Sequence, residues 1–124
     1  MEFLAEGSKD CPLIRLSAFH QPAVLHLRDL INGLATGTVT GDSLHTKPWI
    51  EPINGCELEV SLGKCDQGIM QSGSSRFECV LSHEGWLDVA FLLEPFCVKG
   101  DPSGFQWLNR RGKISFLISS TGTW

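Results

Sequence analysis

Cys65 is the residue of this chain whose type and position come nearest to those of a nucleophile. It lies in the segment Gly63 to Gly68, whose composition is typical of a hairpin tip. An exposed thiol becomes reactive when a neighbouring cation favours the thiolate, and Lys64 offers such a cation, although Asp66 offsets it. The pattern therefore favours an ordinary exposed thiol in a turn over a catalytic one.

Two histidines offer a second kind of chemistry, general acid and base catalysis. His83 is followed by Glu84, and His45 could approach this pair across the fold. Adjacent positions on a helix do not face one another, so His83 and Glu84 are more simply explained as solvated residues of a first helical turn. We retain Cys65, His83 and His45 as candidates for a catalytic site without assigning a reaction.

The histidines and the five cysteines are also the residues that could bind a metal ion. Small zinc sites usually space paired ligands by roughly two to four residues. Here the nearest histidines, His20 and His26, are six residues apart, and no two cysteines have CxxC spacing. Nucleotide-binding, metalloprotease, lipase-type and calcium-binding motifs are missing as well. The sequence predicts neither a metal site nor a cofactor.

Three aromatic residues are candidates for contacts with a partner. Trp49 lies between Pro48 and Pro52, and a braced tryptophan offers a large contact area at little entropic cost. Trp107 precedes two arginines, and Phe91 falls on the polar side of a predicted helix. Because tryptophans are highly buried on average, Trp49 and Trp107 could instead close an edge of the core. Phe91 is a mild indication of self-association.

The segment from Ser82 to Pro95 decides the fold class, because its apolar residues fit both the alternation of a strand and the period of a helix. A helix is favoured because Ser82 is a good N-cap, and because Leu81 and Trp86 are spaced for a hydrophobic staple. The segment is also long for a strand. Pro95 disfavours helical geometry at the residue before it, so we expect a helix over about residues 83–94.

The rest of the chain has one further clear helix and several short strands. The helix is expected over about residues 21–33, where an apolar stripe follows Pro22 and the pair Asn32-Gly33 offers a stop. Alternation and flanking turns predict strands near residues 12–18, 44–50, 56–62, 69–70, 77–81, 105–108 and 113–119. The strand at 44–50 is expected to be an irregular edge strand, and no internal repeat is apparent.

Short connections between these strands predict mostly antiparallel neighbours. We therefore expect a single α+β domain over residues 11–124, with a mostly antiparallel sheet of about five to six strands and both helices packed on one face. Residues 1–10 are polar and acidic, and we expect a loose N-terminal segment there. A chain of 124 residues is long enough to bury a core without a disulfide or a metal.

Composition and charge weigh against several classes of function. The formal net charge of −4 opposes non-specific binding to nucleic acids or to anionic membranes. The apolar runs are far shorter than the roughly 18 residues that a membrane helix needs. No signal peptide is visible, and the five cysteines, an odd number, are typical of reduced thiols. We therefore expect a cytoplasmic protein.

Together these observations predict a non-enzymatic interaction or scaffold domain that acts through a surface, on a protein partner or on a second copy as a homodimer. Two alternatives remain open. One is a small hydrolase or transferase that uses Cys65 or a histidine. The other is a domain that binds a small apolar ligand between the sheet and the helices, because the helical faces are rich in leucine and valine.

Overall fold

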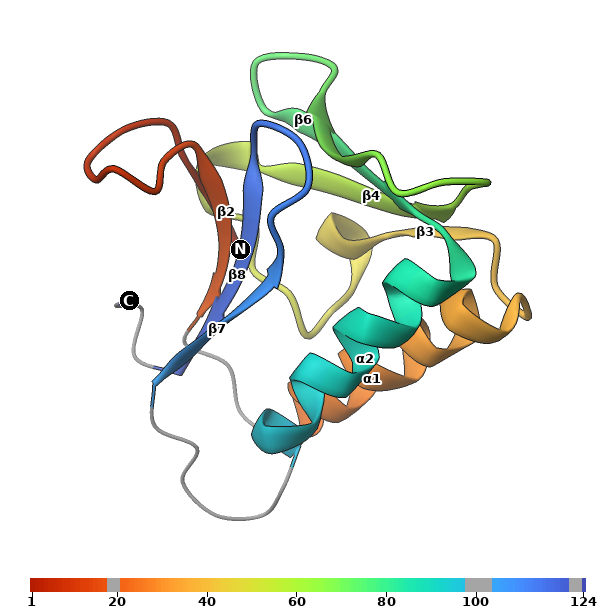
Figure 1. Ribbon diagram of the computed structural model, residues 1–124. Helices are drawn as coiled ribbons and strands as arrows, with labels where there is room; N and C mark the ends of the chain where they lie inside the picture. Colours follow the sequence, from red (N-terminus) through yellow and green to blue (C-terminus); the bar gives the residue numbers. More distant parts are fainter. Residues whose placement is uncertain (18–20, 98–103, 121–123) are drawn as a thin grey trace.

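The fold is an α+β arrangement of two mixed sheets and two helices. The computed structural model describes residues 1–17, 21–97, 104–120 and 124, which form eight strands in two four-stranded sheets (Figure 1). The predicted α+β class is confirmed. The single, mostly antiparallel sheet is wrong, because the strands divide between two sheets and the central pair of each sheet is parallel.

The two sheets have the same plan, with a parallel pair in the centre and an antiparallel strand on each edge. In order across it, the first sheet consists of β1 (Glu2–Leu4), β2 (Leu13–Ser17), β8 (Ser115–Ser119) and β7 (Phe105–Asn109). The second sheet consists of β3 (Gly41–Ser43), β4 (Glu57–Leu62), β6 (Arg76–Leu81) and β5 (Gly68–Gln71). Residues 2–4, which the sequence assigns to a loose segment, thus form an edge strand.

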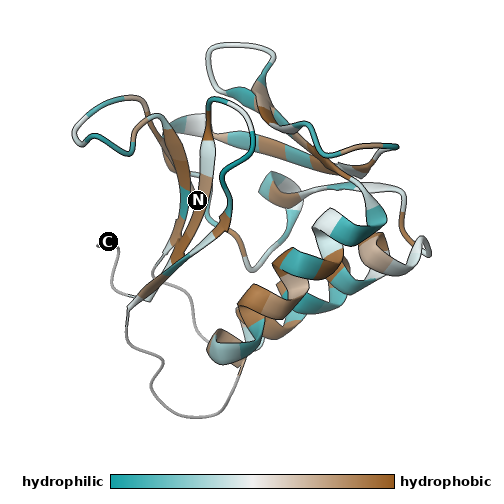
Figure 2. Ribbon diagram, in the orientation of Figure 1, coloured by the Kyte–Doolittle hydropathy of each residue, from teal (hydrophilic) through white to brown (hydrophobic). Residues whose placement is uncertain are grey.

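The helices α1 (Gln21–Thr36) and α2 (His83–Cys97) lie side by side and close the space between the two sheets (Figure 1). Their buried faces join the inner faces of both sheets in one hydrophobic core. Figure 2 shows the apolar residues along the strands and helices, while the loops at the top are largely polar. Among the described residues, no helix is both long and apolar enough to cross a membrane.

Helix α2 confirms the helical interpretation of residues 82–95, but it ends later than predicted. Pro95 lies inside the helix, which continues to Cys97. Proline removes one backbone hydrogen bond, yet Pro95 is on the exposed side, where water can satisfy the carbonyl group that loses its partner. Phe96 and Cys97 are buried and hold the last turn against the core. Tertiary packing therefore outweighs the local proline signal.

Helix α1 also extends beyond its predicted end. It continues past Gly33 to Thr36 because Leu34 is fully buried in the core. Gly37 follows with φ of 83°, a left-handed conformation that glycine adopts readily and that commonly ends helices. The predicted edge strand at 44–50 is wrong: β3 lies earlier, and residues 44–46 form the 3₁₀ turn η1 (Leu44–Thr46). A second such turn, η2 (Ile53–Gly55), precedes β4.

The topology divides the chain into two halves with the same order of elements, two strands, a helix and two strands. Residues 2–62 contribute β1 to β4 with α1, and residues 68–119 contribute β5 to β8 with α2. Exchanging the halves converts one sheet order into the other, so the fold has an approximate internal two-fold symmetry. No repeat is visible in the sequence, because equivalent positions of the two halves share burial rather than residue type.

Equivalent positions in the sheets follow from the strand register. In the first sheet Ile14 pairs with Phe116 and Leu16 with Ile118. The corresponding parallel pairs in the second sheet are Phe77 with Leu58 and Cys79 with Val60. All eight side chains are buried and point into the shared core. Ser119 follows Ile118 in β8 as Ser61 follows Val60 in β4, so these two serines are also equivalent.

Equivalent positions in the helices follow from burial. Counted from the first residue of each helix, Val24 corresponds to Trp86, Leu27 to Val89, Ile31 to Leu93 and Leu34 to Phe96, and every one of them is buried. A helix buries one face at a fixed period, so this match supports one alignment of the two helices. The pair whose side chains differ most in size is Val24 and Trp86.

Candidate functional site

A cavity of about 280 Å³ lies between the first sheet, the beginning of α1 and the segment that leads into β4. Its inner walls come from regular secondary structure. Strands β2 and β8 provide Leu16, Ser17 and Ile118, and helix α1 provides Ala23, Val24 and Leu27. Apart from Ser17, these residues are apolar and buried in the core, so the inner walls are both hydrophobic and fixed.

The outer wall of the cavity is the segment 48–53 together with Met1. Trp49, which the sequence predicts as a contact residue or a plug of the core edge, is half-buried and lines this wall. Its ring stacks against that of His26 on α1, with centroids 5.8 Å apart and planes 21° from parallel. The wall therefore presents a planar aromatic surface that is already held in place.

Hydrogen bonds and an ion pair anchor the outer wall. Before it, the Lys47 ammonium group lies 2.7 Å from the Asp42 carboxylate. Within it, the N-terminal ammonium group of Met1 donates to the Glu51 carbonyl at 2.9 Å, and the Ile53 amide donates to the Met1 carbonyl at 2.9 Å. Burial lowers the pKa of this ammonium group. The segment is fixed on both sides of Trp49.

The symmetry-related region of the second half is filled by a side chain. Trp86 corresponds to Val24, is fully buried, and its indole Nε1–H donates to the Ser61 carbonyl at 2.9 Å. The residues equivalent to the cavity-lining Leu16 and Leu27 are Cys79 and Val89, which are likewise buried. Val24 is much smaller than the tryptophan at the equivalent position, and it borders the cavity, whereas the Trp86 side chain is fully buried among core residues.

A second, larger depression of about 500 Å³ lies between β5, β1 and the loop before β8. The exposed side chains of Met70, Gln71 and Lys113 contribute to its walls. Exposed side chains keep much of their rotamer freedom, so a ligand there would have to order them at an entropic cost. The first cavity, with buried walls on two strands and a helix, is the better candidate.

The three candidate catalytic residues have different surroundings. Cys65 is exposed in the β4–β5 connection. His83 begins α2, and its Nδ1 lies 3.0 Å from the Ala35 carbonyl at the end of α1. His45 lies in η1 with Nε2 3.6 Å from a Glu57 carboxylate oxygen, while its buried Nδ1 has no hydrogen-bond partner among the described residues.

None of these three residues contacts another in the interactions recorded for the described part of the chain. Their catalytic role stays a prediction without a shared site. Similarly, no three His, Cys, Asp or Glu residues within the described ranges are grouped to hold a metal ion.

The two other predicted contact residues, Phe91 and Trp107, differ in how far they are exposed to solvent. Phe91 is 76% exposed and Leu87, one turn earlier on α2, is 59% exposed. Trp107 is half-buried on the outer face of the first sheet, where the Arg110 guanidinium group lies 4.2 Å from its ring centroid. Trp107 is therefore partly covered, whereas Phe91 is open to a partner.

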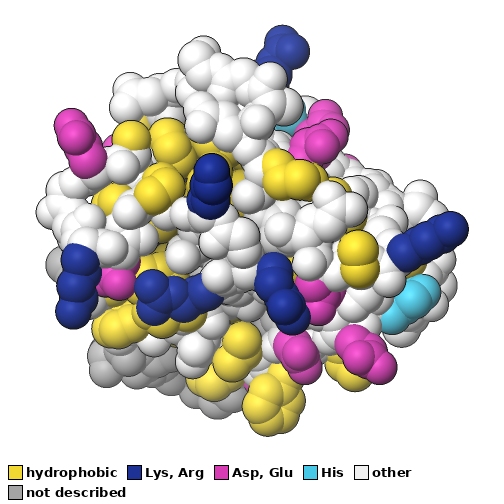
Figure 3. All heavy atoms as spheres, turned by 45° about the horizontal axis from the view of Figure 1, so that its top comes forward, with side chains coloured by type: hydrophobic (Ala, Val, Ile, Leu, Met, Phe, Trp, Pro, Cys, Tyr) yellow, Lys and Arg dark blue, Asp and Glu magenta, His cyan; other side chains and the backbone are white. Residues whose placement is uncertain are grey.

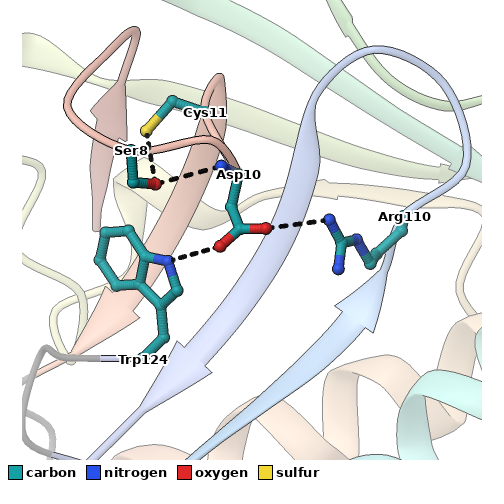
Figure 4. A network of polar contacts seen from close by, with 5 residues as sticks. All are labelled: Ser8, Asp10, Cys11, Arg110 and Trp124. Atoms are coloured by element: carbon teal, nitrogen blue, oxygen red, sulfur yellow. Dashed lines mark hydrogen bonds and ion pairs between the residues drawn. The ribbon is translucent and has the colours of Figure 1, made fainter.

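A polar network crosses the outer face of the first sheet (Figure 4). The Asp10 carboxylate accepts hydrogen bonds from Trp124 Nε1 at 3.2 Å and from Arg110 at 3.3 Å. Ser8 accepts from the Asp10 amide, and its hydroxyl lies 3.7 Å from the Cys11 sulfur atom. No histidine takes part in the network drawn, so it lacks a general base for Cys11 and is best explained as a tie between loops.

Asp66 has a structural role that the sequence analysis did not assign. Its carboxylate accepts hydrogen bonds from the amide and the hydroxyl of Ser82, at 2.9 and 2.8 Å. These bonds lower the pKa of Asp66. The Ser82 hydroxyl lies 3.2 Å from the Gly85 amide, which confirms Ser82 as the N-cap of α2. Asp66 is thus part of a helix cap rather than a catalytic partner of Cys65.

Comparisons of this chain with protein-family models, with curated proteins and with solved structures found no match.

The apolar cavity residues could not be identified from the sequence, because a leucine or valine gives the same pattern whether its side chain borders the core or a cavity. Leu16, Val24 and Ile118 all fit the core-facing pattern of their elements. The informative feature is the difference in side-chain size between Val24 and Trp86. That signal becomes visible only after the two halves have been aligned through their strand register.

Proposed function

We propose that this protein is a binding domain for a small, mainly apolar molecule, which occupies the cavity between β2, β8 and α1. The observation that carries this proposal is the cavity itself, with buried apolar walls on regular elements and an aromatic outer wall. Pockets that bind small molecules are typically concave, largely apolar and formed before the ligand arrives. This function corresponds to the third of the possibilities that the sequence left open.

The size of the cavity limits the ligand. Pockets for drug-sized molecules have volumes of roughly 300–1,000 Å³. A volume of about 280 Å³ is just below that range and favours a compact molecule with few rotatable bonds. The polar residues that line the cavity are Ser17 and Glu51, and the backbone of the outer wall adds further polar groups that can orient the ligand.

A thermal-shift screen of compact apolar compounds tests the proposal. A ligand at 100 times its dissociation constant adds roughly 2.7 kcal/mol to the free energy of unfolding, which raises the Tm by several degrees in a domain of this size. Val24→Trp should remove the shift by filling the cavity. Met70→Trp, which places the same side chain beside the second depression, is the control and should retain the shift. A shift that survives Val24→Trp would place binding elsewhere.

A second candidate function is the interaction or homodimer surface predicted from sequence, and the exposure of Leu87 and Phe91 favours it. These side chains are one helical turn apart on α2, and the same helix carries the exposed acids Glu84, Asp88 and Glu94. On the face drawn in Figure 3, hydrophobic side chains reach the surface among charges of both signs.

Sedimentation velocity tests the second candidate. Two copies joined through α2 would bring their carboxylates together, so a dimer of this kind should strengthen with added salt. The double variant Leu87→Ser with Phe91→Ser should then be monomeric, whereas Met70→Ser, at another exposed apolar residue, should not change the association. A wild-type protein that is monomeric at all salt concentrations would exclude the homodimer.

A further inference from the structure

We infer that the cavity is shaped for a planar bicyclic aromatic molecule of the size of indole that carries an N–H donor. This inference rests on the proposed function and names the chemical class of its ligand. It starts from the internal symmetry, because the second half of the molecule already holds such a group at the equivalent place: the side chain of Trp86.

Three residues of the inner walls of the cavity have assigned equivalents in the second half. Leu16, Leu27 and Ile118 line the cavity, and their equivalents in the second half are Cys79, Val89 and Val60. Both sets consist of buried apolar side chains on two parallel strands and a helix. Val24, at the position of Trp86, carries only two methyl groups on its Cβ and borders the cavity.

The size and shape of the cavity agree with a bicyclic ring. An apolar cavity of roughly 150 Å³ accepts a single benzene ring, so a cavity of about 280 Å³ has room for a second fused ring. The Trp49 ring lines one wall and is fixed by its stacking on His26. Aromatic rings prefer offset-stacked or edge-to-face contacts, which favour a planar aromatic ligand over an aliphatic one.

The hydrogen bond of Trp86 indicates the polar group that the ligand needs. Its Nε1–H donates to the Ser61 carbonyl, and Ser119 is equivalent to Ser61 in the first sheet. Ser119 lies next to the cavity, because its strand neighbour Ile118 and its pairing partner Ser17 both line it. A carbonyl oxygen can accept two hydrogen bonds, so a bond within the sheet leaves room for a second one from a ligand.

Calorimetric titration with three compounds of similar size tests the inference. Indole has the N–H donor, benzofuran has the same shape with an oxygen in its place, and cyclooctanol is neither planar nor aromatic. We expect indole to bind about 3- to 10-fold more tightly than benzofuran, the factor that one hydrogen bond typically contributes. Cyclooctanol should bind at least about tenfold more weakly than indole, because it cannot stack on Trp49.

Two variants and a spectroscopic readout locate the binding. Val24→Trp should abolish indole binding, and Leu27→Phe, a smaller change in the same wall, should weaken it if Val24→Trp does not fold. Met70→Ala, outside the cavity, should bind as the wild type does. In NMR spectra the indole N–H signal of Trp49 should move on titration, while that of Trp107 stays in place.

The outcomes separate this inference from the proposed function. If cyclooctanol binds as tightly as indole and Val24→Trp removes both, the aromatic ligand is wrong while the apolar binding function stands. If benzofuran binds as tightly as indole, the predicted requirement for an N–H donor is wrong and the inference is overturned. If no compound binds in a way that depends on Val24 or Leu27, both the inference and the function proposed for the cavity are overturned.

Discussion

The Asp66 carboxylate accepts hydrogen bonds from both the amide and the hydroxyl of Ser82, so the β4–β5 connection holds the residue that begins helix α2. Arg111, from the β7–β8 connection, lies 3.7 Å from the same carboxylate. Ser82 in turn lies within hydrogen-bonding distance of the Gly85 amide. One side chain therefore links two loops to a helix whose buried face contains Trp86.

Removal of this carboxylate should weaken the fold. We expect Asp66→Ala to lower the free energy of unfolding by about 1–2 kcal/mol, because the partly buried amide and hydroxyl of the N-cap residue Ser82 lose their acceptor. Urea unfolding at pH 7 measures the change. Asp88→Ala, at an exposed carboxylate on the same helix, should change it by less than about 0.5 kcal/mol. Equal effects of the two variants would contradict the capping role.

The same carboxylate should make stability depend on acid. Hydrogen bonds from Ser82 hold the pKa of Asp66 in the folded protein below the ordinary value of an aspartate side chain, which is about 3.9. Its contribution is therefore present above that value and is lost as the pH falls through the lowered pKa. The difference in unfolding free energy between the wild type and Asp66→Asn should shrink between pH 5 and about pH 2. A difference that stays constant would show that the charge is not involved.

Gly85→Ala should destabilise the protein although alanine is the better helix former. An added Cβ would collide with Asp66 Oδ1 and would lie 3.0 Å from Leu81 Cβ. We expect a loss of about 1–3 kcal/mol in place of the roughly 1 kcal/mol gain that an open helical site gives. Thermal unfolding measures it. In the double variant with Asp66→Ala, the loss of unfolding free energy should be smaller than the sum of the losses in the two single variants, because the main clash is removed.

Trp86→Val should create in the second half the arrangement that Val24 has in the first. The free energy of unfolding should fall by about 3–5 kcal/mol, since large buried side chains cost this much when truncated. Added indole should recover part of the lost Tm, because it can occupy the space of the missing ring. Leu93→Ala, at a buried residue of the same helix, should lose stability without recovery by indole.

The cysteines should differ strongly in reactivity towards a disulfide reagent. Cys65 is exposed and should react first, at a rate close to that of free cysteine if it has no catalytic role. Cys79 is fully buried, and burial raises its pKa to about 12, so it should react only after unfolding. Reaction rates of the wild type and of Cys65→Ser with the reagent, measured with and without urea, distinguish the reaction of Cys65 from that of Cys79. A Cys65 that reacts far faster than free cysteine would revive the thiol-enzyme hypothesis.

Local signals in the sequence predicted elements better than their assembly. The Ser82 cap and the apolar stripe that includes Leu27 gave the two helices, and alternation gave β4 and β6 within a residue or two. The parallel pairings of β2 with β8 and of β4 with β6 carry no local signal, because they join strands from different halves. An antiparallel sheet was therefore the natural but incorrect expectation from short connections.

The candidate site was predictable only in part. Trp49 was singled out by its flanking prolines, and it does line the cavity. Val24 could not be singled out, because its significance depends on comparison with Trp86, far away in the chain. Phe91 was assigned to the surface by helical geometry alone, and its 76% exposure confirms that assignment.

The interleaving of the halves has a consequence for how the chain reaches its native state. The central pairing of the first sheet joins residues 13–17 to residues 115–119. Strand β2 can therefore pair with β8 only after nearly all of the described chain has been synthesised. Pairings between such distant strands slow folding, and during synthesis they leave β2 and β4 without their central neighbours. An N-terminal fragment ending after β4 should therefore expose two open strand edges, and its tendency to aggregate would measure how strongly the two halves depend on each other.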